Sequence, residues 1–210
     1  MDWRVAFDFL PIVAQGLWAT ISLSIVGIIG GTTAGILAGL FYESENYIIQ
    51  RSARLYVEVM RNLPMLVKLF FLYFAVGLDA WPAAFLALIL HQSGFISEVI
   101  ASGVRAVPRE QYEAAYTCGL TSFETARYII IPQAFKHVIP PMTSQYVEVI
   151  KNSSVVMVIG VNDLTFVTQE IQYETFRYTE GFVVVTALYI MIAMTVIFAM
   201  NQVQKRMGKK

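Results

Sequence analysis

Residues 113–132 read EAAYTCGLTSFETARYIIIP, a stretch that is half polar in a chain that is mostly apolar. Pro108 precedes it and suits the first turn of a helix, which Gly119 would end. Thr121 or Ser122 can then cap a second helix, which we expect to run up to Pro132. Two short polar helices separated by a glycine predict a compact knob. Such a knob has no role inside lipid, so we expect another protein to grip it.

The composition of the chain indicates that lipid is its main solvent. Of the 210 residues, 57% are hydrophobic and only 14% are charged, whereas soluble domains carry about 25% charged residues. The 15 basic and 15 acidic residues cancel, so no global basic field points to nucleic acid. Cys118 is the only cysteine, which excludes an internal disulfide framework. We expect one integral membrane domain over residues 1–210, without a removable signal segment.

Five stretches are long and apolar enough to cross a bilayer, which takes about 20 residues for a hydrocarbon layer of roughly 30 Å. Polar residues interrupt the second and the fourth of them. The predicted fold class is therefore all-α and integral to the membrane, with five transmembrane helices and a cytoplasmic loop over 105–135. The predicted spans are 16–40, 57–78, 81–104, 138–161 and 181–200.

The basic residues predict the orientation of the chain. With the N-terminus outside, eleven basic residues fall in inner segments and only Arg4 and Arg177 in outer ones, which agrees with the positive-inside rule. The outer loop 162–180 is acidic and compatible with a helix. The chain is thus expected to begin outside and to end in the cytoplasm. The inner basic residues are Arg51, Arg54, Arg61, Arg105, Arg109, Arg127, Lys136, Lys205, Arg206, Lys209 and Lys210.

Four glycines recur at every fourth position of the first predicted span: Gly27, Gly31, Gly35 and Gly39. This spacing places them on one helical face, where a neighbouring backbone can approach closely. The face can pack inside one subunit or form a seam between two.

The polar stretch resembles the coupling loop of permease subunits in binding-protein-dependent ABC importers. That pattern is Glu-Ala-Ala, three residues, Gly, nine residues, and an aliphatic pair before Pro. Further similarity to the polar amino acid uptake branch lies in GLWATI at 16–21, RNLPMLVKLFFLYF at 61–74, IPQAF at 131–135 and KNSSVVMVIGVNDLT at 151–165. The loop residues that match are Glu113, Ala114, Ala115, Gly119, Ile129, Ile131 and Pro132.

This resemblance implies a type I importer permease fold in a bacterial cytoplasmic (inner) membrane. It implies that Glu113, Ala114, Ala115, Gly119 and Pro132 couple the chain to a separate ATPase. Because the chain has no G-x-x-x-x-G-K-[ST] phosphate loop, we expect no enzyme activity and no cofactor here, with ATP and Mg on that partner. The implied partners are two copies of an ATP-binding ABC subunit, a second permease subunit (identical or related), an extracytoplasmic solute-binding protein and lipid, but no nucleic acid.

A polar run in the fourth span is the predicted substrate path: Glu148, Lys151, Asn152, Ser153 and Ser154. Charges at the bilayer centre cost roughly 2.5–3.5 kcal/mol on insertion scales, so these residues must face protein or water. They offer donors to a carboxylate and acceptors to an ammonium group, and the run predicts local unwinding beside a cavity. Alternatively, Glu148 and Lys151 only neutralise each other as an i,i+3 pair.

Other polar residues in the spans have simpler interpretations. Lys68 is expected to snorkel to the interface, Glu98 to serve helix packing and His91 to be a satisfied interior histidine. No grouping has the spacing of metal ligands, so no metal is predicted. The expected cargo is a polar amino acid, with Lys151 favouring an acidic one. The alternative is a secondary amino acid carrier driven by an ion gradient, against which the lack of an internal repeat argues.

Overall fold

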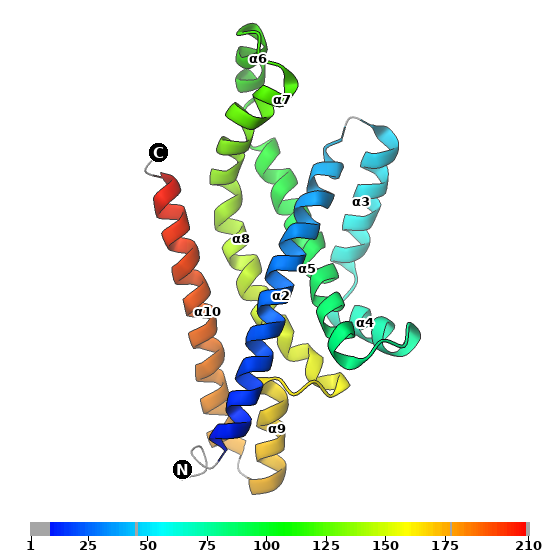
Figure 1. The fold of residues 1–210 in the computed structure, drawn as a ribbon, viewed down its shortest axis with the longest axis vertical. Helices are drawn as coiled ribbons and strands as arrows, with labels where there is room; N and C mark the ends of the chain where they lie inside the picture. The colour runs from blue at the N-terminus through cyan, green and yellow to red at the C-terminus, as the bar shows by residue number, and fades with distance from the viewer. Residues whose placement is uncertain (1–8, 45, 177, 209–210) are drawn as a thin grey trace.

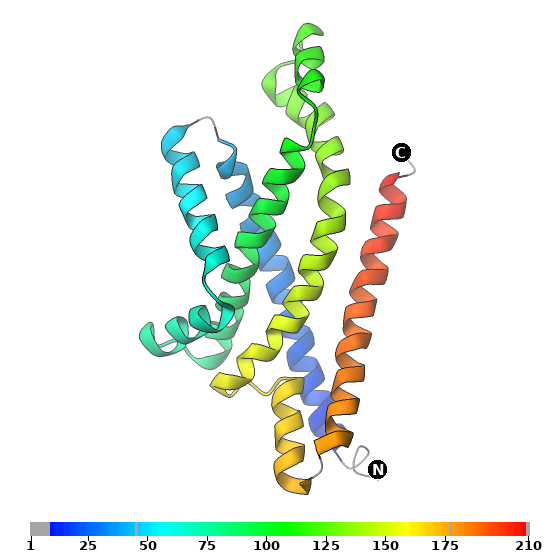
Figure 2. The same ribbon diagram turned by 180° about the vertical axis from the view of Figure 1, so that it is seen from behind.

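The computed structural model describes residues 9–44, 46–176 and 178–208. Every regular element in these ranges is a helix. Four long helices run along the long axis of the molecule: α2 (Leu10–Tyr42), α5 (Ala80–Arg105), α8 (Ile131–Ser153) and α10 (Tyr178–Gly208) (Figures 1 and 2). At one end, α6 and α7 form the projecting knob. We call this the knob end, and the end at which α9 lies the far end.

The glycine face of α2 packs on α5 within the chain. A Cβ placed on Gly35 would lie 2.6 Å from Cβ of Ile96, and one on Gly31 would lie 2.5 Å from Cβ of Gln92. Gly39 meets Ile100 in the same way. Packing inside one subunit is therefore how this face is used, since only glycine lets the two backbones come this close.

The predicted span 57–78 is not a single helix. The segment forms α3 (Tyr47–Asn62), α4 (Met65–Phe70) and the π-helical turn η1 (Phe71–Ala75). The break falls at Leu63 and Pro64, because proline has no amide hydrogen to continue the helix ladder. By length and composition, α2, α5 and most of α10 (Thr179–Met207) qualify as membrane spans among the described residues.

Lys68 does not snorkel, contrary to the expectation from its position. Its Nζ is buried and donates to the carbonyl oxygen of Met60 at 2.6 Å. Pro64 stands four residues after Met60 and cannot supply the amide that would normally bond this carbonyl. The ammonium group of Lys68 replaces that amide. It also donates to Nδ1 of His91 at 2.7 Å, so His91 is a satisfied interior histidine as predicted.

The fourth predicted span is bent. α8 ends at Ser153, a 3-10 helix η3 (Ser154–Ile159) follows, and Gly160 has a φ of +80°. After a short loop, α9 (Leu164–Thr175) leaves at an angle of 50°. The sequence predicts unwinding at the polar run, but the chain stays helical there: α8 passes into a 3-10 helix, and the helical path is interrupted only at Gly160. If this bent pair counts as one span, the described residues hold four candidate spans; a fifth requires the broken α3–α4 segment.

The remaining span boundaries extend beyond the predicted ones. α2 begins six residues before 16, and α10 covers the predicted 181–200 with three residues added at its start and eight at its end. α5 agrees with the predicted 81–104 to within one residue at each end. Arg4, Arg177, Lys209 and Lys210, which entered the orientation argument, lie outside the described residues.

Candidate functional site

The two helices of the knob are each capped where they meet, α6 at its C-terminus and α7 at its N-terminus. α6 (Arg109–Thr117) starts directly after Pro108 and stops at Gly119, whose φ is +80°. The amide of Gly119 bonds the carbonyl of Tyr116 at 3.0 Å, and that of Leu120 bonds the carbonyl of Ala115 at 3.1 Å. These two bonds form a Schellman motif, which satisfies the last carbonyls of the helix. The predicted helix end at Gly119 is confirmed.

Thr121 caps the second helix of the knob through a capping box with Glu124. The amide of Glu124 donates to Oγ1 of Thr121 at 3.3 Å, and the amide of Thr121 donates to Oε2 of Glu124 at 2.9 Å. The Thr121 hydroxyl also donates to this carboxylate, at 2.7 Å. The bond from the hydroxyl, and then that from the amide, lowers the pKa of Glu124 below its ordinary value. The carboxylate thus helps to fix the turn between the two helices.

The second helix does not end at Pro132, which corrects the sequence-based boundary. α7 (Ser122–Glu124) continues through the π-helical η2 (Thr125–Ile130) directly into α8. Pro132 is tolerated at the second position of α8, because first-turn amides need no partner in the preceding turn. The π-helical turn shifts the hydrogen-bond register just before it. The knob is therefore rigidly continuous with a long membrane helix.

The predicted coupling residues divide between the core and the surface of the knob. Ala115 is buried as α6 packs on η2, whereas Glu113, Ala114, Gly119 and Pro132 are exposed. Glu113 lines a cavity of about 640 Å³ between α6 and the knob end of α5. The other residues that line this cavity are Glu43, Val104, Arg105, Val107, Arg109, Tyr112 and Tyr116.

Three aromatic side chains of the knob, not singled out from the sequence, are exposed: Tyr116, Phe123 and Tyr128. Phe123 has 71% of its surface open. Large exposed side chains on an otherwise polar projection are typical of a protein contact surface. The signal was present in the sequence as aromatic residues on helices too polar to enter lipid.

At the polar run, Glu148 and Lys151 form an ion pair, with Nζ and Oε2 at 2.5 Å. Both side chains are exposed, and Asn152 is half-buried beside them. Ser153 is buried and bonds the carbonyl of Ile150, while Ser154 bonds the carbonyl of Lys151. The structure thus places the five predicted path residues together at the α8–η3 junction. It also shows the i,i+3 pair given as the alternative.

A cavity of about 320 Å³ adjoins this junction. It lies between α8, α9 and α10, and its lining is mostly hydroxyl-bearing and aliphatic side chains. Lys151 is the charged residue among those that line it: Ile150, Lys151, Ser154, Thr165, Thr168, Phe182, Val185, Thr186, Tyr189 and Ala193.

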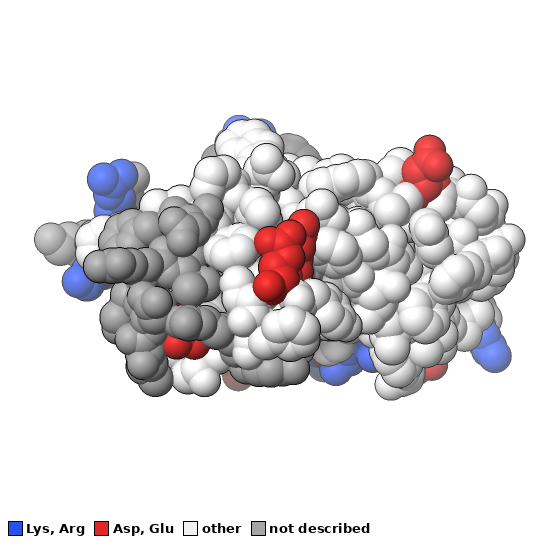
Figure 3. Space-filling model, turned by 90° about the horizontal axis from the view of Figure 1, so that it is seen from below, with Lys and Arg blue, Asp and Glu red and all other residues white. Residues whose placement is uncertain are grey.

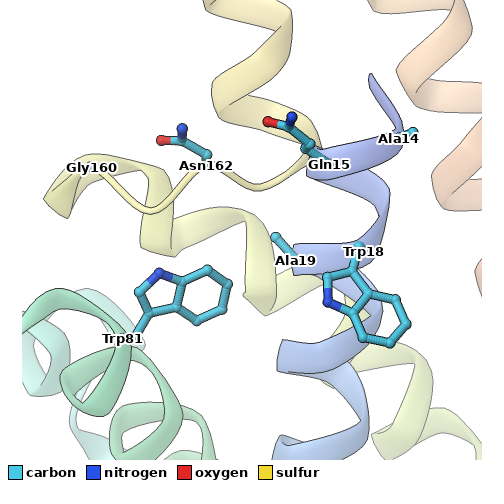
Figure 4. Close-up of a pocket in the computed structure, with 7 residues that line it drawn as sticks. All are labelled: Ala14, Gln15, Trp18, Ala19, Trp81, Gly160 and Asn162. Carbon is cyan, nitrogen blue, oxygen red and sulfur yellow. The ribbon is translucent and has the colours of Figure 1, made fainter. Parts of the chain in front are cut away.

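A second cavity, of about 660 Å³, lies near the far end. The indole rings of Trp18 and Trp81 stand on opposite sides of it, and the amides of Gln15 and Asn162 lie along its edge (Figure 4). Sequence reasoning did not find this cavity, because its walls come from α2, α5 and the loop before α9. Figure 3 views the molecule from the far end, where acidic side chains stand out near the centre.

Among the residues that the structure describes, no three His, Cys, Asp or Glu side chains are grouped to hold a metal ion.

Sequence comparison decides between the classes of transport protein. Residues 31–209 match the family model described as "Binding-protein-dependent transport system inner membrane component". The chain belongs to this family. It is therefore an inner membrane permease subunit of an importer and not a secondary carrier.

Relatives of this permease cover its whole length. The glutamine transport system permease protein GlnP of Escherichia coli (strain K12) is 30% identical, over 98% of this chain and 97% of that protein. The probable glutamine ABC transporter permease protein GlnM of Bacillus subtilis (strain 168) is 29% identical, over 100% and 99%.

A solved structure has the same fold as this permease. The chain from a crystal structure of an amino acid ABC transporter with histidines superposes with a TM-score of 0.91 at 31% identity, covering 98% of this chain and 99% of that one. The type I importer permease architecture expected from the sequence is thus confirmed at the level of the fold.

Proposed function

We propose that this permease subunit forms, with a second permease subunit, the passage through which an importer carries a polar amino acid across the inner membrane. The observation that carries the proposal is the knob. It has the complete Glu-Ala-Ala to Pro spacing, two well-capped helices and three exposed aromatic side chains. Two ATPase subunits and an extracytoplasmic binding protein complete the proposed assembly.

The cargo class rests on the relatives and on the charges at the polar run. The two relatives are named for glutamine, and the related structure is of an amino acid transporter. Lys151 is already neutralised by Glu148, so it adds no net positive charge that would favour an acidic amino acid. We infer a polar amino acid without net charge, with glutamine as the first candidate.

The proposed mechanism couples the knob to the bend in α8. Closure of the ATPase pair moves the knob, and the continuous α7–η2–α8 helix transmits that motion to the junction at Ser153 and Ser154. At the junction, Lys151 would bind the carboxylate of the cargo and Glu148 its ammonium group, each exchanging its present partner for the cargo. In this proposal α3–α4–η1 is the fifth span, the knob end is cytoplasmic and the N-terminus lies outside.

Reconstitution tests the assignment. The complete transporter with its binding protein should hydrolyse ATP faster in the presence of glutamine and accumulate it in vesicles. Removal of residues 113–119 should abolish both ATPase association and uptake while membrane insertion persists. Full co-purification and uptake by the deleted form would show that the knob is not the coupling element.

The cargo site is tested separately. Lys151→Ala should weaken uptake at low glutamine concentration, and Lys205→Ala, a change at an exposed lysine near the end of α10, serves as the control. An unchanged concentration dependence in Lys151→Ala would remove this side chain from the passage without affecting the coupling assignment.

A further inference from the structure

One face of α5 carries a line of polar and aromatic side chains beside the buried face that packs on α2. His91, Phe95, Glu98, Ser102 and Arg105 recur at alternating spacings of four and three, which places them on a single helical face. All five are half-exposed or exposed, whereas Gln92, Ile96 and Ser97 on the neighbouring face are buried. We call these five residues the α5 stripe.

A series of ring contacts and ion pairs links residues of the α5 stripe to one another and to Arg61 and Glu43. The ring of His91 meets that of Phe95 edge to face, with centroids 5.1 Å apart, and the guanidinium of Arg61 lies 5.8 Å from the Phe95 ring. Arg61 contacts Glu98, with Nη1 and Oε2 at 3.3 Å. Arg105 bonds Glu98 at 2.8 Å and Glu43 at 2.7 Å. Charges of alternating sign thus follow one another from α3 through α5 to the end of α2.

Arg61 and Glu98 lie within the helix bundle, whereas Arg105 and Glu43 stand at the knob ends of α5 and α2, and all four side chains are open to their surroundings. Glu98 is seven residues from the end of α5, or about 10 Å at 1.5 Å per residue, and Phe95 is about 15 Å from it. The side chains of Arg61, Glu98 and Arg105 are 41%, 30% and 45% exposed. Charged groups facing lipid at depth are unfavourable by roughly 2.5–3.5 kcal/mol each on insertion scales. Their exposure therefore indicates water or a polar partner beside them.

The neighbouring helix α3 continues the same polar surface. Arg54, Glu58 and Arg61 follow at spacings of four and three on α3, and all three are exposed. α3 packs against α5 where Gly94 meets Met60 and Arg61, so the charged line of α3 borders the α5 stripe. Toward the knob, Arg105 and Glu43 line the cavity of about 640 Å³ that also contains Glu113. The polar surface therefore leads from mid-helix to the coupling segment.

We propose that the α5 stripe and the charged line of α3 form a water-facing wall of the inner half of the substrate passage. The inference rests on the proposed function and assigns residues to its passage. An amino acid zwitterion would meet alternating positive and negative groups along this wall. Because Arg61, Glu98 and Arg105 are already paired within the chain, these positions do not hold the cargo tightly, as conduction through successive weak sites requires.

Thiol accessibility tests the wall. In the complete transporter in lipid nanodiscs, single Phe95→Cys and Ser102→Cys variants are treated with a charged soluble maleimide, and labelling is read peptide by peptide by mass spectrometry. Cys118 lies on the knob that the ATPase is proposed to contact, so it is replaced by Ala in every variant. Lys205→Cys, at an exposed position near the end of α10, reports that the reagent is active. Phe95→Cys is the decisive variant for the proposed wall. Ser102 lies near the end of α5, so its labelling does not distinguish a passage from the membrane surface.

The matched control is Leu37→Cys on α2. Gly35 meets Ile96 and Gly39 meets Ser97, so Leu37 lies at the same depth as the stripe. Its side chain is 54% exposed on an apolar face. We expect Phe95→Cys to react at least tenfold faster than Leu37→Cys, and saturating glutamine to slow its reaction several-fold.

Two results would overturn the inference. One is reaction of Phe95→Cys no faster than that of Leu37→Cys while Lys205→Cys is labelled, which would place the stripe against lipid or protein. The other is fast labelling that a cargo able to stimulate ATPase activity does not slow. Uptake by the unmodified transporter is measured in parallel, so a failure of the proposed function is distinguished from a failure of this wall.

Discussion

At the scale of single residues, the roles of Lys68 and Gly119 are both explained by the local backbone. Pro64 leaves the carbonyl of Met60 without its amide, and the buried ammonium of Lys68 bonds that carbonyl from eight residues along the chain. Gly119 adopts a left-handed φ that lets α6 end in a Schellman motif. In both cases a backbone hydrogen bond that the helix cannot make in the ordinary way determines which residue is suitable at the position.

Replacing Lys68 by Met should destabilise the permease. The change leaves the carbonyl of Met60 unbonded and removes a hydrogen bond from a charged donor, which contributes about 1.5–3 kcal/mol in other proteins. We expect a loss of that order in the free energy of unfolding, measured in bicelles. Lys205→Met, at an exposed lysine, is the control and should be neutral. Equal stability of the two variants would contradict the bonding role of Lys68.

Gly119→Ala should weaken the knob, because an L-residue in the left-handed region costs about 1–2 kcal/mol. A Cβ at Gly119 would meet nothing within 4 Å, so any effect comes from backbone strain and not from a clash. Gly119→Asn should be milder, since asparagine tolerates this conformation. Thermal unfolding and ATPase association of the two variants check the ranking, and a reversed order would refute the explanation.

At the scale of elements, the knob and the α2–α5 pair are held by different means. The knob relies on caps and a short hydrogen-bonded turn around Thr121 and Glu124. The α2–α5 pair relies on glycines that allow close backbone approach, reinforced by the hydroxyl of Ser97 bonding the carbonyl of Gly35 at 3.1 Å. A change of pH should therefore affect the stability of the knob, and an increase in side-chain volume should affect the packing of α2 on α5.

The capping box should weaken in acid. The pKa of Glu124 is lowered in the folded state, so its stabilising contribution is complete above its ordinary value and is lost as the pH falls through the lowered one. Hydrogen exchange of the amides of Thr121 and Glu124, corrected for the intrinsic pH dependence, should show this loss. Glu124→Gln keeps a capping side chain without the charge, so its protection should not change over the same range.

Gly35→Ala should separate α2 from α5. The added Cβ would lie 2.6 Å from Cβ of Ile96 and 3.0 Å from the carbonyl oxygen of Ser93, neither of which can move easily. Overpacking of this kind typically costs 1–3 kcal/mol, and we expect a loss of about that size in unfolding free energy. Gly181→Ala is the matched control, with ordinary contacts at 3.7 Å and beyond. An equal loss at Gly181 would argue against the packing explanation.

At the scale of the whole molecule, the buried carboxylate of Asp163 connects α9 to α10 at the far end. Asp163 caps α9 by accepting the amide of Phe166 at 3.0 Å, and it accepts the hydroxyl of Tyr189 on α10 at 2.9 Å. Next to it, the amide of Leu164 donates to Oγ1 of Thr20 on α2 at 3.1 Å. Three elements distant in sequence thus meet where α8 and α9 bend apart.

Asp163→Ala combined with Tyr189→Phe tests this junction. Each single change should lower the free energy of unfolding, Asp163→Ala more, because it removes the acceptor of the Phe166 amide and one partner of the Tyr189 hydroxyl. That hydroxyl keeps Oγ1 of Thr165 as a partner. The double variant should lose less than the sum, with a coupling of about 0.5–3 kcal/mol for groups in direct contact. Strict additivity would show that the two side chains do not depend on each other.

Local chemistry was sufficient to predict much of this protein. Composition predicted a membrane environment, and the spacing from Glu113 to Pro132 predicted the family. Gly119 and Thr121 predicted where the knob helices end and begin. Such features depend on residues close in sequence. The sequence also grouped Glu148 with Lys151, which are neighbours on one helical turn. The family model and the related structure support the fold, whereas the roles of the path residues stay predictions.

Only the tertiary structure decided which contacts Lys68, Pro132 and the α5 stripe make. The position of Lys68 in an apolar run predicted snorkelling, but a carbonyl orphaned by Pro64 and the lone pair of His91 hold it inside. Pro132 predicted a helix end, but a π-helical turn carries the helix past it. Arg61, Glu43 and Glu98 come from three helices, and no periodicity within one helix can show that their charges meet. Contacts between distant segments depend on how helices pack, and packing is a property of the whole chain.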